Sequence, residues 1–394
     1  MRYTANELEG YAIKFTTTMR QLENDIMTDI VRRIKINGEI TRSADWQIHR
    51  LHQLGESKRV IKKKIKEALN LSTQEVNHLF KDVIRKGYAE DERLYKHKGK
   101  PYIPFEDNKQ LQQLITATAL QTQNEIKNIT QSLGFAVKQP DGTLAFTPVA
   151  DYYQKVLDKA TLSIATGTFD YNTVLKKAVA ELTNSGLRTV YYASGWHNRI
   201  DVATRRAVMT GFNQIVAKVN DENAERLGTN YFEVSWHGGA RPTHQLWQGR
   251  VYSREQLETV CGLGEVTGLC GANCYHSYWA FFKDIDEPTY TEEQLAEMNR
   301  QENISVEYNG KKYTKYQAYQ RQRRLETTMR SQRQKIKLLK EGGADENEII
   351  TARGKYRVTS AEYTRFSQAM NLPQQRERVT IDGLGDIARG KYKL

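Results

Sequence analysis

The sequence has few cysteines, few prolines and no long apolar run, and these shortages exclude several classes of protein. Only three cysteines occur among 394 residues, all between Cys261 and Cys274, which argues against a secreted disulfide scaffold. The N-terminus lacks the apolar core of a signal peptide, and no apolar run is long enough to span a bilayer. We therefore expect synthesis and folding in a reducing cytoplasm, without a membrane-spanning segment.

Motifs of common enzyme classes are also missing. The sequence contains neither the G-x-x-x-x-G-K-[ST] loop of nucleotide hydrolases nor the G-x-G-x-x-G of dinucleotide-binding proteins. Ser194 lies outside the G-x-S-x-G setting that a hydrolase nucleophile requires. We therefore assign no catalytic residues and expect a protein that is not an enzyme.

Charged residues are abundant instead. They make up 27% of the chain against 39% hydrophobic residues, and the mean hydropathy is −0.71, which favours extended helices with large solvated faces. The net charge of +12 suggests either a polyanionic partner or a basic surface of no specific use. A clustered distribution of the cations would favour a polyanionic partner over a basic surface of no specific use.

Apolar spacing predicts a mainly helical α+β protein with small β elements. Residues 1–135 are expected to be helical, with capping boxes at Thr4/Glu7 and Ser72/Glu75. Glycines suited to helix ends follow at Gly38, Gly55, Gly87 and Gly134. The predicted domains are a helical N-terminal region (1–135), a central α+β module with a Cys/His loop (136–300) and a basic helical C-terminal region (301–394).

Turn signals and periodicity divide the remainder of the chain. A hairpin turning at 139–142 precedes a helical stretch at 149–182, and a second hairpin turns at Asn309-Gly310. A long helix at 198–227 ends at Gly228 and is followed by strands at 231–236 and 277–282. Helices at 315–340 and 345–370 are expected to form an αα-hairpin around Gly342-Gly343, and 374–394 to be partly ordered at best.

The central module concentrates residues that can bind metal. Six imidazole or thiol side chains fall within forty residues: His237, His244, Cys261, Cys270, Cys274 and His276. Thiolate and imidazole are the ligands of tetrahedral zinc sites. We favour a structural Zn²⁺ site made by His244, Cys270, Cys274 and His276, since a metal could replace the missing core of a glycine-rich loop. The alternative is a set of buried free thiols and hydrogen-bonded histidines.

The helix at 315–340 concentrates positive charge. Its candidate nucleic-acid-binding residues are Arg321, Arg323, Arg324, Arg330, Arg333, Lys335, Lys337 and Lys340. Such a density of cations can bind phosphates without reading sequence. An acidic protein partner and a plain solvated face are the two other interpretations.

Three motifs of the central module carry a family resemblance: HGGARPTH at 237–244, WQGRVY at 247–252 and GLCGANCYH at 268–276. Together they resemble the phage minor capsid protein 2 family, and similar stretches continue to about residue 380. The block is more distantly similar to Mu F-like head morphogenesis proteins. It departs from them because His244 stands where they carry a cysteine and 274–276 replaces their Cys-Arg-Cys.

The resemblance implies a minor structural protein of a tailed-phage head. It implies a location in the virion head, synthesis in the host bacterium, and partners that include the portal protein, other head proteins and packaged double-stranded DNA. A role in head assembly or in DNA packaging or ejection would follow. Two alternatives come from other classes: an effector enzyme carried in the head, and a non-specific DNA-binding protein without a capsid role.

Overall fold

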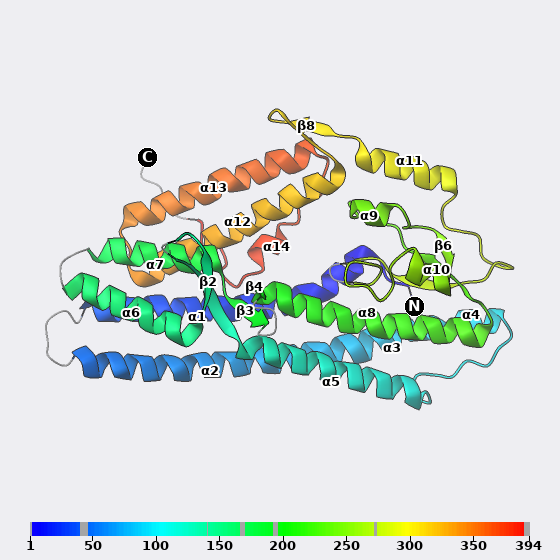
Figure 1. Cartoon of the computed structure of the whole chain (residues 1–394), viewed down its shortest axis with the longest axis horizontal. Helices are drawn as coiled ribbons and strands as arrows, with labels where there is room; N and C mark the ends of the chain where they lie inside the picture. The colour runs from blue at the N-terminus through cyan, green and yellow to red at the C-terminus, as the bar shows by residue number, and fades with distance from the viewer. Residues whose placement is uncertain are drawn as a thin grey trace. The chain divides into compact units, whose positions relative to one another are not determined.

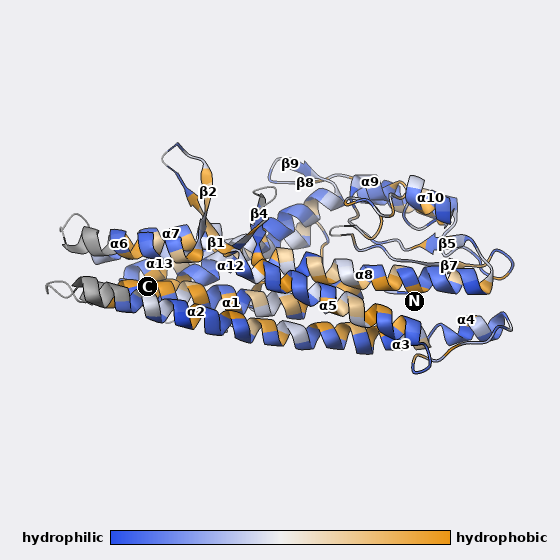
Figure 2. Cartoon of the chain, turned by 60° about the horizontal axis from the view of Figure 1, so that its bottom comes forward, coloured by the Kyte–Doolittle hydropathy of each residue, from blue (hydrophilic) through white to orange (hydrophobic). Residues whose placement is uncertain are grey.

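A computed structural model describes residues 2–39, 46–139, 141–165, 170–191, 196–271 and 274–389. The chain is mainly helical and carries three small antiparallel sheets (Figure 1), which confirms the predicted α+β, mainly α fold. Hydrophilic and hydrophobic residues alternate along the helices (Figure 2), as expected for helices with one buried face.

The N-terminal third is helical, as predicted. Its elements are α1 (Ala5–Glu39), α2 (Trp46–His78), a π-helical turn (Leu79–Val83), α3 (Ile84–Ala89), α4 (Glu92–His97) and α5 (Lys109–Gln131). The capping box at Thr4 is confirmed: the Glu7 carboxylate accepts from the Thr4 N–H at 2.8 Å, and the Thr4 hydroxyl accepts from the Glu7 N–H. The second predicted box is wrong, because Ser72 is buried inside α2.

Two of the predicted helix ends are also wrong, because Gly55 lies within α2 and Gly87 within α3. A glycine costs a helix only about 1 kcal/mol, which burial of the apolar face of α2 outweighs. Gly134 follows the end of α5 and is the second residue of a strand. Gly38 lies in the last turn of α1, which ends at Glu39, so the helix end predicted there is confirmed.

The chain forms two compact units, each built from segments that are distant in sequence. Unit 1 comprises residues 1–15, 72–126 and 205–320, and unit 2 comprises residues 16–71, 127–204 and 321–394. Several helices contribute residues to both: α1, α2, α5, α8 (Ile200–Leu227) and α12 (Lys315–Gly342). The predicted domain boundaries at 135 and 300 divide the chain into continuous segments, unlike these two discontinuous units. These boundaries stay a prediction.

Unit 1 contains a three-stranded sheet of order β6-β5-β7. The strands are β5 (Tyr231–Val234), β6 (Val251–Ser253) and β7 (Tyr278–Phe281), and β5 pairs antiparallel with both neighbours. One face of this sheet packs into an apolar core with Leu227 of α8 and Leu257 of α10 (Arg254–Thr259). The predicted strands at 231–236 and 277–282 are thus confirmed, while β6 was not predicted.

Unit 1 also contains α9 (Pro242–Gln245), α11 (Glu292–Asn303) and the hairpin of β8 (Val306–Tyr308) with β9 (Lys311–Tyr313). Asn309 and Gly310 both have positive φ at its turn, as the Asn-Gly signal predicts. Neither α11 nor the short α9 was predicted.

Unit 2 contains a four-stranded sheet of order β2-β1-β3-β4. The hairpin of β1 (Leu133–Lys138) and β2 (Leu144–Pro148) is confirmed, while β3 (Arg188–Tyr191) and β4 (Trp196–Arg199) were not predicted. The helical stretch expected at 149–182 is confirmed and consists of two helices, α6 (Val149–Ala165) and α7 (Tyr171–Ser185). Asp170 caps α7 by accepting from the Thr173 N–H.

The predicted αα-hairpin is confirmed as α12 and α13 (Glu346–Ala369), which lie side by side in Figure 1. The expectation that the chain after 374 is partly ordered at best is wrong for residues 374–389, which include α14 (Glu377–Thr380). Val379 is 1% exposed and Asp382 3% exposed, so this segment packs into unit 2 through both apolar and charged contacts.

Candidate metal centre and basic helix

The Cys/His loops of unit 1 bring three potential metal ligands together. His244 lies on α9, and Cys274 and His276 lie just before β7. All three are buried, and within the described part of the chain they form a group whose ligand atoms lie within 4.8 Å of one another. Three of the four predicted ligands therefore share one site.

The three ligand atoms form a small triangle. The two Nδ1 atoms of His244 and His276 are 3.4 Å apart, and the Cys274 Sγ lies 3.9 Å from the first and 3.4 Å from the second. Tetrahedral zinc with ordinary Zn–N and Zn–S bonds requires about 3.3 Å between two nitrogens and about 3.6 Å between nitrogen and sulfur. The triangle therefore has the size of one face of a zinc tetrahedron.

Hydrogen bonds on the far side of each ring fix which nitrogen carries the proton. The His244 Nε2 lies 2.8 Å from the Thr267 carbonyl oxygen, which can only accept, so Nε2–H donates. The His276 Nε2 lies 2.9 Å from the Gln248 Oε1. That oxygen also accepts from the backbone N–H of His237, which settles the orientation of the amide.

Both neutral imidazoles therefore direct a bare Nδ1 lone pair at the other. Two lone pairs at 3.4 Å repel each other unless a proton or a cation lies between them. Among the described residues, the Cys274 thiol contacts both nitrogens and can donate its proton to only one of them. Acceptors that hold the outer nitrogen of a ligating histidine are characteristic of metal sites.

Burial sets the protonation states in the absence of a cation. It lowers the pKa of His244 and lowers that of His276 well below its ordinary value, so both rings are neutral. Burial also raises the pKa of the Cys274 thiol. A bound cation would reverse this last effect, because coordination deprotonates a thiol.

The remaining cysteines and His237 lie around this group. The thiol of Cys270, the fourth predicted ligand, donates to the His276 carbonyl oxygen at a sulfur–oxygen distance of 3.6 Å and lies outside the triangle. The His237 ring lies over the His276 ring at 4.2 Å between centroids, and its Nδ1 lies 3.1 Å from the Gly238 carbonyl oxygen. Cys261 is buried in the apolar core of the sheet.

Glycines allow the loop to fold back on itself around the ligands. A Cβ at Gly268 would lie 2.0 Å from the Gly262 carbonyl oxygen, and one at Gly271 would lie 2.5 Å from that of Val266. Trp247 packs against the rings of both histidines, with its ring centroid 4.5 Å from that of His244 and 4.8 Å from that of His276. Backbone contact and one tryptophan thus enclose the triangle.

The predicted basic helix, α12, uses most of its charge inside unit 2. Of its eight candidate cations, all of which are described, only Arg324 is exposed. Arg333 forms a buried ion pair with Asp382, with both side chains 4% exposed. Burial lowers the pKa of Arg330 to about 10.

The other five candidates are half-buried, and four of them contact oxygens of the same unit. Arg321 pairs with Glu362, Arg323 with Glu326, and Lys337 with Glu341, while Lys340 donates to a backbone carbonyl. Burial lowers the pKa of Lys335. A linear sequence cannot reveal a partner on another element, such as Glu362 on α13, whereas Glu326 and Glu341 lie one turn from their partners on α12 itself.

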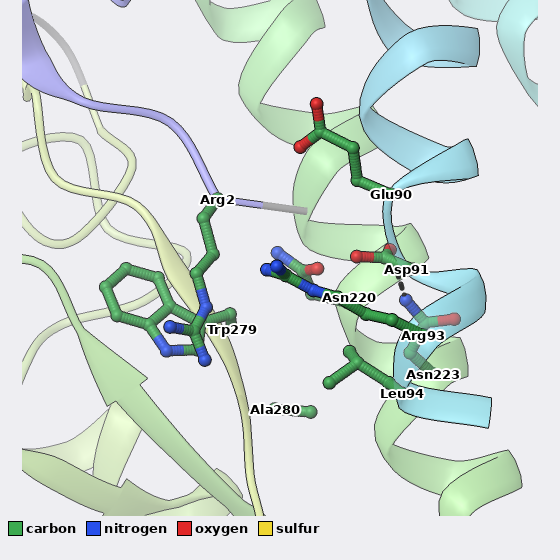
Figure 3. Close-up of a pocket in the computed structure, with 9 residues that line it drawn as sticks. All are labelled: Arg2, Glu90, Asp91, Arg93, Leu94, Asn220, Asn223, Trp279 and Ala280. Atoms are coloured by element: carbon green, nitrogen blue, oxygen red, sulfur yellow. Dashed lines mark hydrogen bonds between the residues drawn. The ribbon is translucent and has the colours of Figure 1, made fainter. Parts of the chain in front are cut away.

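A small pocket in unit 1 has a polar lining (Figure 3). The Arg2 guanidinium lies over the Trp279 ring at 4.7 Å, and the Asn223 amide donates to Asp91 at 2.7 Å. Asn223 also accepts from the Tyr95 hydroxyl. Arg2 is thus stacked on a ring, and Asn223 bonds to both Asp91 and Tyr95. We therefore interpret the pocket as part of the packing between the N-terminal segment, α4, α8 and β7.

Comparison with known proteins gives the family: the model of phage minor capsid protein 2 matches residues 5–366, and the chain belongs to this family. The predicted family membership is thus confirmed, and with it a structural role in the phage head. Neither the curated proteins nor the solved structures contain a match. Among the described residues, no helix has an apolar stretch long enough to cross a membrane.

Proposed function

We propose that the protein is a minor component of the virion head, placed there by contact with the portal, that acts in head assembly or in DNA packaging or ejection without catalysing a reaction. The family match over residues 5–366 supports this most directly. The extensive charged surface suits contact with other head proteins and with packaged DNA.

Quantitative mass spectrometry of purified procapsids and mature virions tests this proposal. A small, fixed ratio of this protein to the portal in both particles is the expected result. Absence from both particles would refute a head role. Presence at the copy number of the major shell protein would refute a minor, portal-associated one.

We further propose that His244, Cys274 and His276 hold a structural Zn²⁺ ion through Nδ1, Sγ and Nδ1. The spacing of these atoms, their buried setting and the acceptors behind both rings support the site. The fourth position would be filled by Cys270 after a local rearrangement of its loop, or by water. A closed four-ligand site is the usual form of structural zinc.

Metal analysis of the purified chain tests the zinc proposal. We expect one zinc per chain, lost in Cys274→Ala. Cys261→Ala is the matched control, because it removes another buried thiol of the same module and should keep the metal. Cys270→Ser then distinguishes the fourth ligand, since zinc affinity falls if Cys270 binds and stays the same if water does. A metal-free wild-type protein purified with zinc in excess would overturn the site.

A further inference from the structure

The exposed face of α2 carries an unbroken stripe of positive charge. From residue 56 to 66, every exposed residue is a cation: Lys58, Arg59, Lys62, Lys63 and Lys66. The intervening positions, such as Ser57 and Val60, are buried or half-buried against unit 2. The stripe therefore follows from helical periodicity, with small and apolar residues on the inner face and cations on the outer face.

These cations are largely uncompensated within the described part of the chain. Arg59 pairs with Glu56, and the half-buried Lys64 pairs with Asp25 and Glu67. The four exposed lysines of the stripe have no ion-pair partner among the described residues, in contrast to the candidate cations of α12. A surface with concentrated positive charge creates a potential that attracts polyanions.

We propose that this stripe on α2 is the surface through which the protein binds the phosphate backbone of double-stranded DNA. The inference rests on the proposed head function, in which packaged DNA is the polyanion at hand. Lys58, Lys62 and Lys66 follow each other by one helical turn and span about 12 Å. A duplex presents one phosphate per roughly 3.4 Å of each strand over that distance.

The chemistry of the stripe suits phosphate contacts that do not depend on a fixed geometry. Four of its five members are lysines, which bind phosphates as mobile point charges. The exposed positions between 56 and 66 carry neither an aromatic ring to stack on bases nor an amide to read base edges. Binding should therefore be independent of sequence, as contact with a whole packaged genome requires.

Salt-dependent binding of the full chain to a fluorescent 30-base-pair duplex of arbitrary sequence tests this proposal. Neutralising about five phosphates gives a slope near −4.5 in a plot of log K against log salt, or about a 500-fold loss of affinity between 50 and 200 mM salt. The variant Lys58→Gln/Lys62→Gln/Lys63→Gln/Lys66→Gln should reduce the slope by about 3.6. Its melting temperature should match the wild type, because the four side chains have no partner to lose.

The matched control removes the same charge elsewhere, through glutamine at four other exposed lysines: Lys100, Lys109, Lys127 and Lys155. It should keep most of the wild-type slope. Equal losses in both variants would overturn the site, because binding would then follow net charge alone. Tighter binding of poly-L-glutamate than of the duplex would overturn DNA as the partner and indicate an acidic protein. These outcomes are separate from head incorporation, which the mass spectrometry decides.

Discussion

The buried pair of Arg333 and Asp382 should be among the most sensitive points of unit 2. Both side chains are 4% exposed, and the carboxylate accepts from Nε at 2.6 Å and from Nη2 at 2.9 Å. Burial lowers the pKa of Arg333, but the hydrogen bonds and charge of Asp382 outweigh burial and leave it raised. The pair connects α12 to the segment after α14, which sequence reasoning expected to be poorly ordered.

Asp382→Asn keeps the shape of the side chain and removes its charge. Removing one partner of a buried pair costs about 3–5 kcal/mol, because the other charge stays buried without compensation. Arg333→Met/Asp382→Leu removes both charges and should recover part of that loss. The recovery is incomplete because the Gly385 carbonyl and the Leu384 N–H each lose a hydrogen bond worth about 1 kcal/mol.

Urea unfolding, together with limited proteolysis of residues 374–389, measures these effects. Asp386→Asn is the matched control in the same segment, because its partner Arg389 is 84% exposed and the ion pair should contribute less than about 1 kcal/mol. We expect a large loss of unfolding free energy for Asp382→Asn, or selective cleavage of the segment, and neither for Asp386→Asn. Equal, small effects of the two variants would refute the reasoning.

Three further predictions concern acid stability, the glycine-rich loop and the metal. Burial raises the pKa of Asp201, but Arg20, Arg330 and Arg199 outweigh it and leave the pKa lowered. The ionised Asp201 therefore stabilises the fold fully above its ordinary pKa near 3.8, and this stabilisation is lost as the pH falls through the lower pKa of the folded state. Asp201→Asn should lower the free energy of unfolding at pH 7 and flatten its decline between about pH 4 and 2. An unchanged dependence of stability on acid pH would contradict this. Gly268→Ala should lower the melting temperature and the zinc content together, because its Cβ would meet the Gly262 backbone. Gly264→Ala is the control, because its Cβ would meet no neighbouring atom. The positive φ of Gly264 adds strain to this variant, but it should keep the zinc. Chelation should lower the melting temperature of the wild type but leave that of Cys274→Ala unchanged, as differential scanning fluorimetry can check.

Sequence periodicity predicted those elements whose pattern is local. The helix at 198–227, the hairpins turning at 139–142 and 309–310, and the αα-hairpin all follow from apolar spacing and turn residues, and all are found. The false helix start at Ser72 and the false stops at Gly55 and Gly87 have one cause. At each position a local signal was given more weight than the burial of the inner face of the helix that contains it, which is α2 for Ser72 and Gly55 and α3 for Gly87.

For the candidate sites too, the sequence predicted which residues are involved but not the contacts that depend on the fold. The clustering of rare cysteines and histidines predicted His244, Cys274 and His276 as neighbours. Cys274 and His276 are two residues apart, whereas the fold brings in His244 from 30 residues earlier in the chain. The roles of Thr267 and Gln248 behind the rings depend on the folded loops and gave no sequence signal. Charge density favoured α12 over α2, although α12 is packed on unit 2 and α2 presents its cations outward. The α2 stripe could have been predicted from residues 57–66, where cations recur at helical spacing between small and apolar residues.

The discontinuous make-up of the two units has a consequence for synthesis on the ribosome. Unit 2 begins at residue 16 and takes its last segment from residue 321 onward, while unit 1 needs residues near both 15 and 320. Neither unit can close its core until most of the chain has emerged, so long-range contacts must form late and slowly. Nascent α1 and α2 would meanwhile expose their apolar faces. Whether folding of the chain depends on host chaperones should therefore be tested during infection. A deletion series intended to isolate one unit should return insoluble fragments, whereas internal loops such as 139–142 are better places for a tag.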